Sequence, residues 1–203
     1  MMGLAEEKKI FDQGYEIIGA LDEAGRGPLA GPVVAACVII KANFRINNEL
    51  KEVNDSKKLT AKKRELLFEL IKKHFVEVGV GACDHRTIDR INILQATFLA
   101  MKKAISSLRN KPQFLMIDGS LKIPNCSMDQ QAFIKGDERI FTIAAASIIA
   151  KVIRDRIMRE IDKLYPNYGF KQHKGYGTKD HLEKLEKYGP CPIHRLSFNK
   201  VKA

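Results

Sequence analysis

The first half of the chain alternates short apolar runs with longer amphipathic stretches. Four short apolar runs stand out, and the first two are also rich in β-branched residues and bounded by turn residues: YEIIGAL (15–21), GPVVAACVII (31–40), VEVGVGA (76–82) and QFLMIDG (113–119). Runs of this length and composition predict buried β-strands.

Apolar positions spaced three and four residues apart predict helices between and after the strands. The basic loop NDSKKLTAKKRE leads into a helix for which Thr60 is a suitable N-cap. A second helical stripe covers residues 93–108. A long helix is expected from Ile143 to about Leu164, because Pro166 follows and proline cannot continue a helix.

The remaining segments have no clear period. Residues 121–137 are rich in turn formers, and after residue 165 the pattern indicates a loop, one helix in TKDHLEKLEKY and a tail. Strands and helices mixed in this order predict an α/β fold in a single domain over residues 1–203. Its core is expected at about 15–165, followed by a small helical, substrate-binding extension at about 166–203.

Acidic residues follow two of the predicted strands in the same way. Asp22 comes after IIGAL, and Asp118 comes after FLMI. Because strand ends gather at one edge of a layered sheet, we expect Asp22 and Asp118 to lie close together. Glu23 can join them only if the strand ends there, since neighbours on a strand point to opposite faces. Asp137, in KGD, is the fourth candidate acid.

Carboxylates packed together repel one another unless a cation neutralises them. Their hard oxygen atoms suit Mg²⁺ or Mn²⁺ better than zinc. Two such ions about 4 Å apart stabilise the attacking and leaving oxygens of phosphodiester hydrolysis. Taken alone, Asp118 is better explained as the start of a turn. The pair Asp22 and Glu23, set before a glycine-rich loop, favours the metal interpretation.

That loop consists of Gly25, Arg26 and Gly27. Glycines let the backbone approach a ligand closely, so its amide and carbonyl groups can contact a sugar hydroxyl. Arg26 can reach a phosphate. The phosphate-binding pattern GxxxxGK[ST] is absent, and so is a convincing dinucleotide-binding GxGxxG, which argues against kinases and dehydrogenases.

A polar stripe runs along the apolar long helix, formed by Ser147, Lys151, Arg154 and Asp155. Such a stripe is commonly a solvated face. Ser147 and Lys151 lie among apolar neighbours, so contact with a phosphate is an equally good interpretation. Asp155 is an alternative fourth acid, or it pairs with Arg156 or Arg159.

The net charge of +11 over 203 residues favours a polyanionic partner. Basic residues gather in SKKLTAKKR, which includes Lys57, and in residues 171–203. Lysine-rich surfaces are also common where they only promote solubility.

No apolar run is long enough to span a membrane, and the N-terminus has no signal core, so a cytoplasmic protein is expected. The four cysteines form no CxxC pair, which predicts free thiols. A zinc site from His181, Cys191 and His194 is disfavoured, since their spacing matches no standard template.

Six motifs together resemble, in order, those of the bacterial ribonuclease HII family: GALDEAGRGPLAGPVVAA, NDSKKLTAKKRE, FLMIDG, KGDERIFTIAAASIIAKVIRDRIM, HKGYGTKDH and PIHRLSF. They span about residues 16–198. The resemblance implies a ribonuclease H-like fold, with a central mixed sheet flanked by helices. It also implies metal-dependent cleavage of the RNA strand of RNA·DNA hybrids. Duplex DNA with single embedded ribonucleotides would be incised 5′ of them, leaving a 3′-hydroxyl and a 5′-phosphate.

Matching motifs imply roles for particular residues. The ligands of two divalent ions, Mg²⁺ or Mn²⁺, would be Asp22, Glu23, Asp118 and Asp137. Because Asp22 ends the innermost predicted strand, we expect it to contact both ions. Gly25–Gly27 would contact the ribose 2′-hydroxyl, and Tyr176 in HKGYGT would pack against the sugar at the RNA-to-DNA junction. A monomer is expected. The sequence leaves open whether the tail after Phe198 binds a sliding clamp.

Two other classes of protein remain as alternatives. A nucleic-acid-binding protein without catalysis would explain the positive charge, but its phosphate partner would be repelled by the four acids. Another nuclease of the ribonuclease H superfamily, such as a resolvase, would explain the acids. The GRG loop and Tyr176 speak against it.

Overall fold

A five-stranded mixed sheet lies at the centre of the molecule, in the order β3-β2-β1-β4-β5. The computed structural model describes residues 2–201. The strands are β1 (Ile17–Ala24), β2 (Val33–Lys41), β3 (Glu77–Cys83), β4 (Phe114–Asp118) and β5 (Asp129–Phe133). β2 pairs antiparallel with β1 and β3, whereas β4 runs parallel to β1 and β5.

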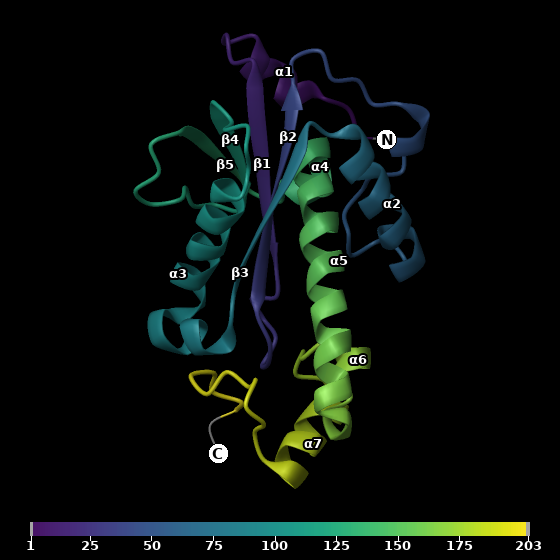
Figure 1. The fold of residues 1–203 in the computed structure, drawn as a ribbon, viewed down its shortest axis with the longest axis vertical. Coiled ribbons are helices and arrows are strands. Elements are labelled where there is room, and N and C mark those ends of the chain that lie inside the picture. Colours follow the sequence, from purple (N-terminus) through teal and green to yellow (C-terminus); the bar gives the residue numbers. More distant parts are fainter. Residues whose placement is uncertain (1, 202–203) are drawn as a thin grey trace.

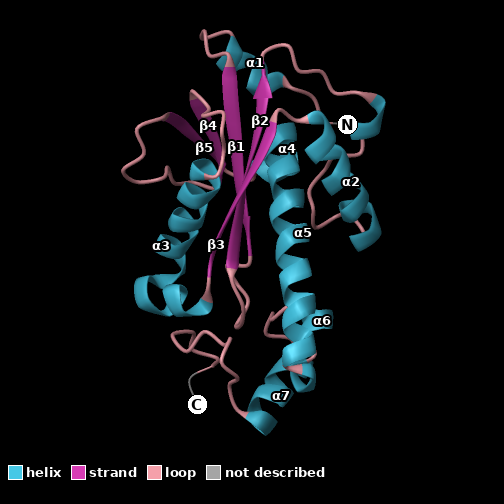
Figure 2. Ribbon diagram, viewed as in Figure 1, coloured by secondary structure: helices cyan, strands magenta, loops and turns pink. Residues whose placement is uncertain are grey.

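Helices cover both faces of this sheet, as Figures 1 and 2 show. The helices are α1 (Ala5–Phe11), α2 (Ala61–His74), α3 (His85–Ser106), α4 (Gly136–Arg139), α5 (Phe141–Leu164), α6 (Phe170–His173) and α7 (Lys179–Tyr188), with 3₁₀ turns η1 (Asn48–Leu50) and η2 (Pro166–Tyr168). α3 packs on one face, and α5 and α2 pack on the other. The α/β expectation is confirmed.

Alternation along β1 divides the core into two halves. Ile18 and Ala20 pack with residues of α2 and α5, whereas Leu21 packs with residues of α3. Both halves are made mainly of buried aliphatic and aromatic side chains. Because side chains alternate with a period of two, Asp22 shares the α5 face with Ile18 and Ala20.

Several predicted boundaries are confirmed closely. α2 begins after Thr60, whose hydroxyl oxygen accepts a hydrogen bond from the Lys63 amide. α5 ends at Leu164, and the helix in TKDHLEKLEKY is α7. None of the helices in residues 2–201 is both long and apolar enough to cross a membrane.

Other predictions about secondary structure were wrong. β1 continues through Ala24, so Asp22 and Glu23 lie inside the strand rather than after it. The helix predicted over residues 93–108 is present from Ile93 to Ser106, but α3 also includes an unpredicted segment from His85, which precedes a break in helical geometry at Asn92. The turn-rich segment 121–137 contains β5, a short and largely polar edge strand whose pattern is too weak to predict.

α1, which the sequence pattern did not predict, supplies a cap for α5. Glu7 is fully buried, and its Oε1 accepts hydrogen bonds of 3.0 Å from both the amide and the hydroxyl of Thr142. The N-cap residue of α5 itself, Ile140, makes no side-chain hydrogen bond to the start of the helix. Burial raises the pKa of the Glu7 carboxyl.

We therefore expect Glu7→Ala to lower the free energy of unfolding by about 1–3 kcal/mol, because two buried donors lose their acceptor. Urea denaturation measures this loss. Glu6→Ala is the matched control, since Glu6 pairs with Lys9 on the surface, and its effect should stay within about 0.5 kcal/mol. Equal midpoints for the two variants would contradict the capping role.

Candidate active site

Strand register brings the first two acids together. In the parallel pair β1–β4, Leu21 lies opposite Ile117, and each is followed by an aspartate. Asp137 arrives on α4, which is held at the end of β4 by Asp118. Oδ1 of Asp118 accepts hydrogen bonds from the amides of Gly136 at 2.7 Å and of Asp137 at 3.3 Å.

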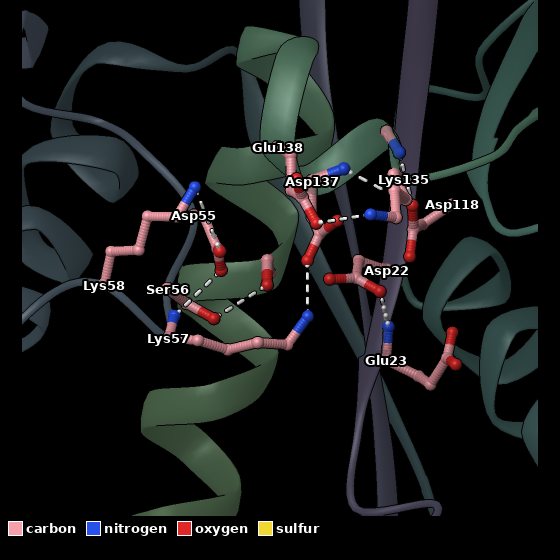
Figure 3. A network of polar contacts seen from close by, with 12 residues as sticks. Asp22, Glu23, Asp55, Ser56, Lys57, Lys58, Asp118, Lys135, Asp137 and Glu138 are labelled. Atoms are coloured by element: carbon pink, nitrogen blue, oxygen red, sulfur yellow. Dashed lines mark hydrogen bonds and ion pairs between the residues drawn. The ribbon is translucent and has the colours of Figure 1, made fainter.

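Asp22, Asp118 and Asp137 consequently converge (Figure 3). One carboxylate oxygen from each lies within 4.8 Å of the others. Asp22 and Asp137 are buried and Asp118 is half-buried. In the part of the chain that the structure describes, no other group of histidine, cysteine or acidic side chains meets in this way. A donor set made only of carboxylate oxygens fits hard divalent cations.

Glu23 lies next to this cluster but points away from it (Figure 3). The strand continues past it, so its side chain leaves β1 on the opposite face from Asp22. Its Oε1 lies 3.3 Å from Nη1 of Arg26. The structure thus brings three of the four predicted acids together and places the fourth beside the glycine loop.

The electrostatics of the cluster reflect crowded negative charge. Burial raises the pKa of Asp22 well above its usual range, and repulsion from Glu23 and Asp118 adds to the shift. Burial and repulsion from Asp137 also raise the pKa of Asp118. For Glu23, burial raises the pKa and Arg26 opposes the rise. Such a group of acids is stabilised by added positive charge.

Lys57 brings one positive charge to the cluster. Its Nζ lies 2.7 Å from Oδ2 of Asp137, and this hydrogen bond raises the pKa of the lysine. Ser56, the residue before Lys57, connects this loop to α5, because its hydroxyl lies 2.9 Å from the hydroxyl of Ser147. Figure 3 shows the lysine reaching the acids from the side opposite Asp118.

A cleft of about 230 Å³ joins the acids to the predicted substrate contacts. It is lined by Asp22, Glu23, Ala24, Gly25, Arg26, Gly27, Ser56, Lys57, Asp118, Ser147, Lys151 and Tyr176. Tyr176 is 42% exposed, and a methyl group built on Gly27 would lie 3.9 Å from its ring. All seven residues predicted to bind substrate therefore border one cleft with Asp22, Glu23 and Asp118, whereas Asp137 is not among the residues that line it.

The polar stripe of α5 is more than a solvated face. Lys151 donates to Asp155 at 2.7 Å, and Arg64 lies 3.7 Å from the same carboxylate. Asp155 stands outside the acid cluster. The alternative pairing with Arg156 or Arg159 was wrong, because both of these guanidinium groups bind Glu65 instead.

Two further places lack the features of a metal or catalytic site. The three residues of the disfavoured zinc site do gather, but Nε2 of His181 bonds Nε2 of His194 at 3.0 Å, and Nδ1 of His194 accepts from the Cys191 amide. A larger hollow of about 810 Å³ beside the C-terminal end of α5 contains none of the predicted site residues.

Two buried arginines under the glycine loop had no predicted role there. Arg195 belongs to the motif PIHRLSF, and Arg154 belongs to the polar stripe. Both are fully buried and donate to main-chain carbonyls of residues 25–32. Membership of these two motifs was the only sequence signal.

Comparisons with known proteins identify the family of this chain. The family model described as Ribonuclease HII matches residues 18–201. A Ribonuclease HII of Caldanaerobacter subterraneus subsp. tengcongensis is 55% identical over 95% of this chain and 78% of its own length.

Two solved structures share the fold. The ribonuclease H2 of Pyrococcus horikoshii OT3 aligns with a TM-score of 0.74 and 29% identity, covering 92% of this chain and 95% of that one. The RNase HII of Archaeoglobus fulgidus, solved as a complex with PCNA, also has a TM-score of 0.74, with 27% identity over 90% of this chain and 95% of its own. The chain therefore belongs to the ribonuclease HII family and is an endoribonuclease of ribonuclease H type 2.

Proposed function

We propose that this endoribonuclease cleaves the RNA strand of RNA·DNA hybrids and incises 5′ of single ribonucleotides embedded in duplex DNA. The products would carry a 3′-hydroxyl and a 5′-phosphate, as ribonucleotide excision repair and DNA replication require. One observation supports this substrate class most strongly. Asp22 and Asp118 of the acid cluster border a single cleft with Glu23, the glycine loop and Tyr176, so a phosphodiester at these acids has its ribose beside the loop.

Asp22, Asp118 and Asp137 would hold two divalent cations, Mg²⁺ or Mn²⁺. Glu23, which points away from these three acids and pairs with Arg26, would have to turn toward them to serve as the fourth ligand. The oxygen-only donor set and the excess of negative charge in the cluster support this assignment. Bound there, the cations would supply activation of the attacking water and stabilisation of the leaving 3′ oxygen. Asp22, on the central strand of the sheet, is the residue that we expect to contact both.

Basic and hydroxyl groups around the acids would position the scissile phosphate. The side chain of Lys57 is 73% exposed although its ammonium group reaches Asp137, so a phosphate entering the cleft meets that charge. Lys151 is held by Asp155, which keeps its charge on the cleft side of α5. Ser147 can donate to the same phosphate or to Asp22.

Recognition of RNA would depend on the ribose 2′-hydroxyl, the group that DNA lacks. The backbone of Gly25, Arg26 and Gly27 is the surface that would contact it, and the ring of Tyr176 would pack against the sugar. Residues 166–203 would extend the surface for the duplex backbone, within a single catalytic domain that acts as a monomer.

Two duplexes of identical sequence test this function, one with a single ribonucleotide and one entirely of DNA. In Mg²⁺ or Mn²⁺ the enzyme should nick only the first, on the 5′ side of the ribonucleotide. Extension of the nicked strand by a DNA polymerase would confirm the 3′-hydroxyl. Cleavage of both duplexes would indicate a nuclease that does not recognise ribose, and this result would refute the proposal.

Removal of the tyrosine ring should affect cleavage far more than folding. Loss of stacking against a nucleotide costs about 1–3 kcal/mol, so Tyr176→Ala should lower kcat/KM on the single-ribonucleotide duplex by about ten- to a hundredfold. Tyr188→Ala removes a similarly exposed ring that does not line the cleft, and should leave kcat/KM unchanged. Parental activity of Tyr176→Ala would exclude the role.

A further inference from the structure

Two guanidinium groups are buried beneath the loop between β1 and β2 without a carboxylate partner. Arg154 and Arg195 are both 0% exposed. Neither takes part in an ion pair anywhere in residues 2–201. Burying an unpaired charge is costly unless hydrogen bonds compensate for lost hydration. Replacement by apolar side chains would be the simpler way to fill a core, so the arrangement calls for an explanation.

Main-chain carbonyls take the place of the missing acids. Nη2 of Arg195 donates to the oxygen of Gly25 at 2.6 Å and Nη1 donates to that of Arg26 at 2.9 Å. Nε and Nη2 both donate to the oxygen of Gly31, at 3.0 and 2.9 Å. Burial, together with repulsion from Arg154, lowers the pKa of Arg195 to about 9. The guanidinium group therefore stays charged at neutral pH.

Arg154 supports the same loop from α5. It donates to the oxygens of Pro32 at 2.9 Å and Ala30 at 3.2 Å, and its guanidinium carbon lies 5.8 Å from the centre of the Tyr176 ring. Gly25 has φ +99°, and a Cβ there would lie 2.0 Å from Nε of Arg154. Only glycine at residue 25 allows this approach.

The direction of these carbonyls fixes the direction of the neighbouring amides. In a trans peptide group the C=O and N–H bonds point in opposite directions, and no cis peptide occurs in the described chain. The oxygens of Gly25 and Arg26 point to Arg195, so the N–H groups of Arg26 and Gly27 point away from it. Both residues are exposed and line the cleft, and neither N–H has an acceptor within residues 2–201.

We propose that Arg195 is a positioning residue for ribose selection, which orients the amides of Arg26 and Gly27 as paired donors to the ribose 2′-oxygen. This inference rests on the proposed function of the glycine loop. The positive charge of Arg195 also polarises the two peptide groups, which strengthens their N–H groups as hydrogen-bond donors. In this arrangement Arg195 does not contact the substrate. It acts through the loop, and the ligands that it helps to select are nucleotides with a 2′-hydroxyl on the sugar.

Arg195→Lys is the most direct test. Lysine keeps a positive charge but lacks the planar fork that spans three carbonyls. We expect kcat/KM on the single-ribonucleotide duplex to fall by about a hundredfold, because a small misplacement of a binding group can cause a loss of this size. Affinity for the all-DNA duplex should change by less than about twofold, because phosphate contacts dominate it. Arg159→Lys is the control, since Arg159 binds Glu65 on the surface and should retain parental values.

A spectroscopic measurement separates positioning from a general loss of structure. In ¹⁵N-labelled parent protein with EDTA, the amide signals of Arg26 and Gly27 should shift more with the ribonucleotide duplex than with the all-DNA duplex. Arg195→Lys should lose this difference and keep the spectrum of the sheet. A folded Arg195→Lys protein with parental kcat/KM and parental shifts would overturn the proposal.

If Arg195→Lys does not fold, a measurement on the parent protein still tests the proposal. The Nε proton of Arg195 should exchange with water at least about a hundredfold more slowly than that of Arg26, because it is buried and bonded to a carbonyl. Equal exchange rates would refute the arrangement. Failure of the proposed function looks different, since the parent itself would then cut the all-DNA duplex or spare the ribonucleotide.

Discussion

An Asp22→Asn variant is expected to lose about a thousandfold or more of the parent's kcat/KM on the single-ribonucleotide duplex. Asparagine has nearly the same shape, but it removes one negative charge and one carboxylate oxygen from the centre of the cluster. Interactions with charge that develops in the transition state are among the largest single contributions to catalysis. Multiple-turnover kinetics with Mg²⁺ and with Mn²⁺ measure the loss.

The same substitution should leave the fold intact and raise its stability in EDTA. The pKa of Asp22 is raised in the folded protein, so its ionisation costs stability at every pH above that raised value and costs nothing below the pKa of the unfolded chain. Asparagine carries no charge at any pH. Each kcal/mol of relieved repulsion should raise Tm at pH 7.5 by about 2–4 °C.

Divalent cations provide the contrasting measurement. A ligand that binds the folded state and not the unfolded state stabilises a protein. Mg²⁺ or Mn²⁺ should therefore raise the Tm of the parent, and it should raise the Tm of Asp22→Asn much less. Asp129→Asn is the control, because Asp129 is a surface acid bonded to Tyr15 and the cation-induced rise should persist. Parental activity together with the full cation-induced rise in Asp22→Asn would show that Asp22 is not a ligand.

The parts of the fold that sequence patterns predicted are those in which one physical effect dominates. β2 is buried on both faces and reads as a continuous apolar run. α5 has a long apolar pattern and a proline after it. β5 and α1 gave no such signal, because β5 is held by its parallel pairing with β4 and α1 by the burial of Glu7 against α5. Contacts between distant segments decide both.

The site shows the same division. Asp22 and Asp118 were expected to meet because both mark the end of an apolar run, and the register of two parallel strands does bring them together. The position of Glu23 was not predictable, since it depends on β1 continuing for two more residues. Arg195 gave no sign of its function, because a buried guanidinium that binds only carbonyls leaves no charge pattern in the sequence.

Acid should destabilise the protein through three histidines that hold the Tyr176 segment. His173, His181 and His194 lie together, with the first two rings stacked 4.4 Å apart. Nδ1 of His181 lies 2.9 Å from the oxygen of Tyr176, and its Nε2 faces Nε2 of His194 at 3.0 Å. This set of bonds requires neutral rings, because a doubly protonated His181 would direct an N–H at the N–H of His194.

Burial lowers the pKa of His181 to about 4, and it lowers the pKa values of His173 and His194 as well. The unfolded chain, with histidine pKa values near 6.5, therefore binds more protons than the folded one as the pH falls from about 6.5 to about 4. Stability rises with pH wherever the unfolded state binds more protons, so it is fully present above about pH 6.5. At pH 5 His181 alone should cost about 2 kcal/mol.

Urea denaturation between pH 5 and pH 8 measures this dependence. His181→Asn removes the titrating ring while its amide can still donate to the Tyr176 oxygen, so its free energy of unfolding should depend less on pH than that of the parent, whatever its absolute value. His74→Gln is the control, because His74 lies outside the cluster and bonds Asn47 and Glu49 near the surface. Parallel pH curves for the parent and His181→Asn would show that the buried histidines do not set the acid limit of the fold.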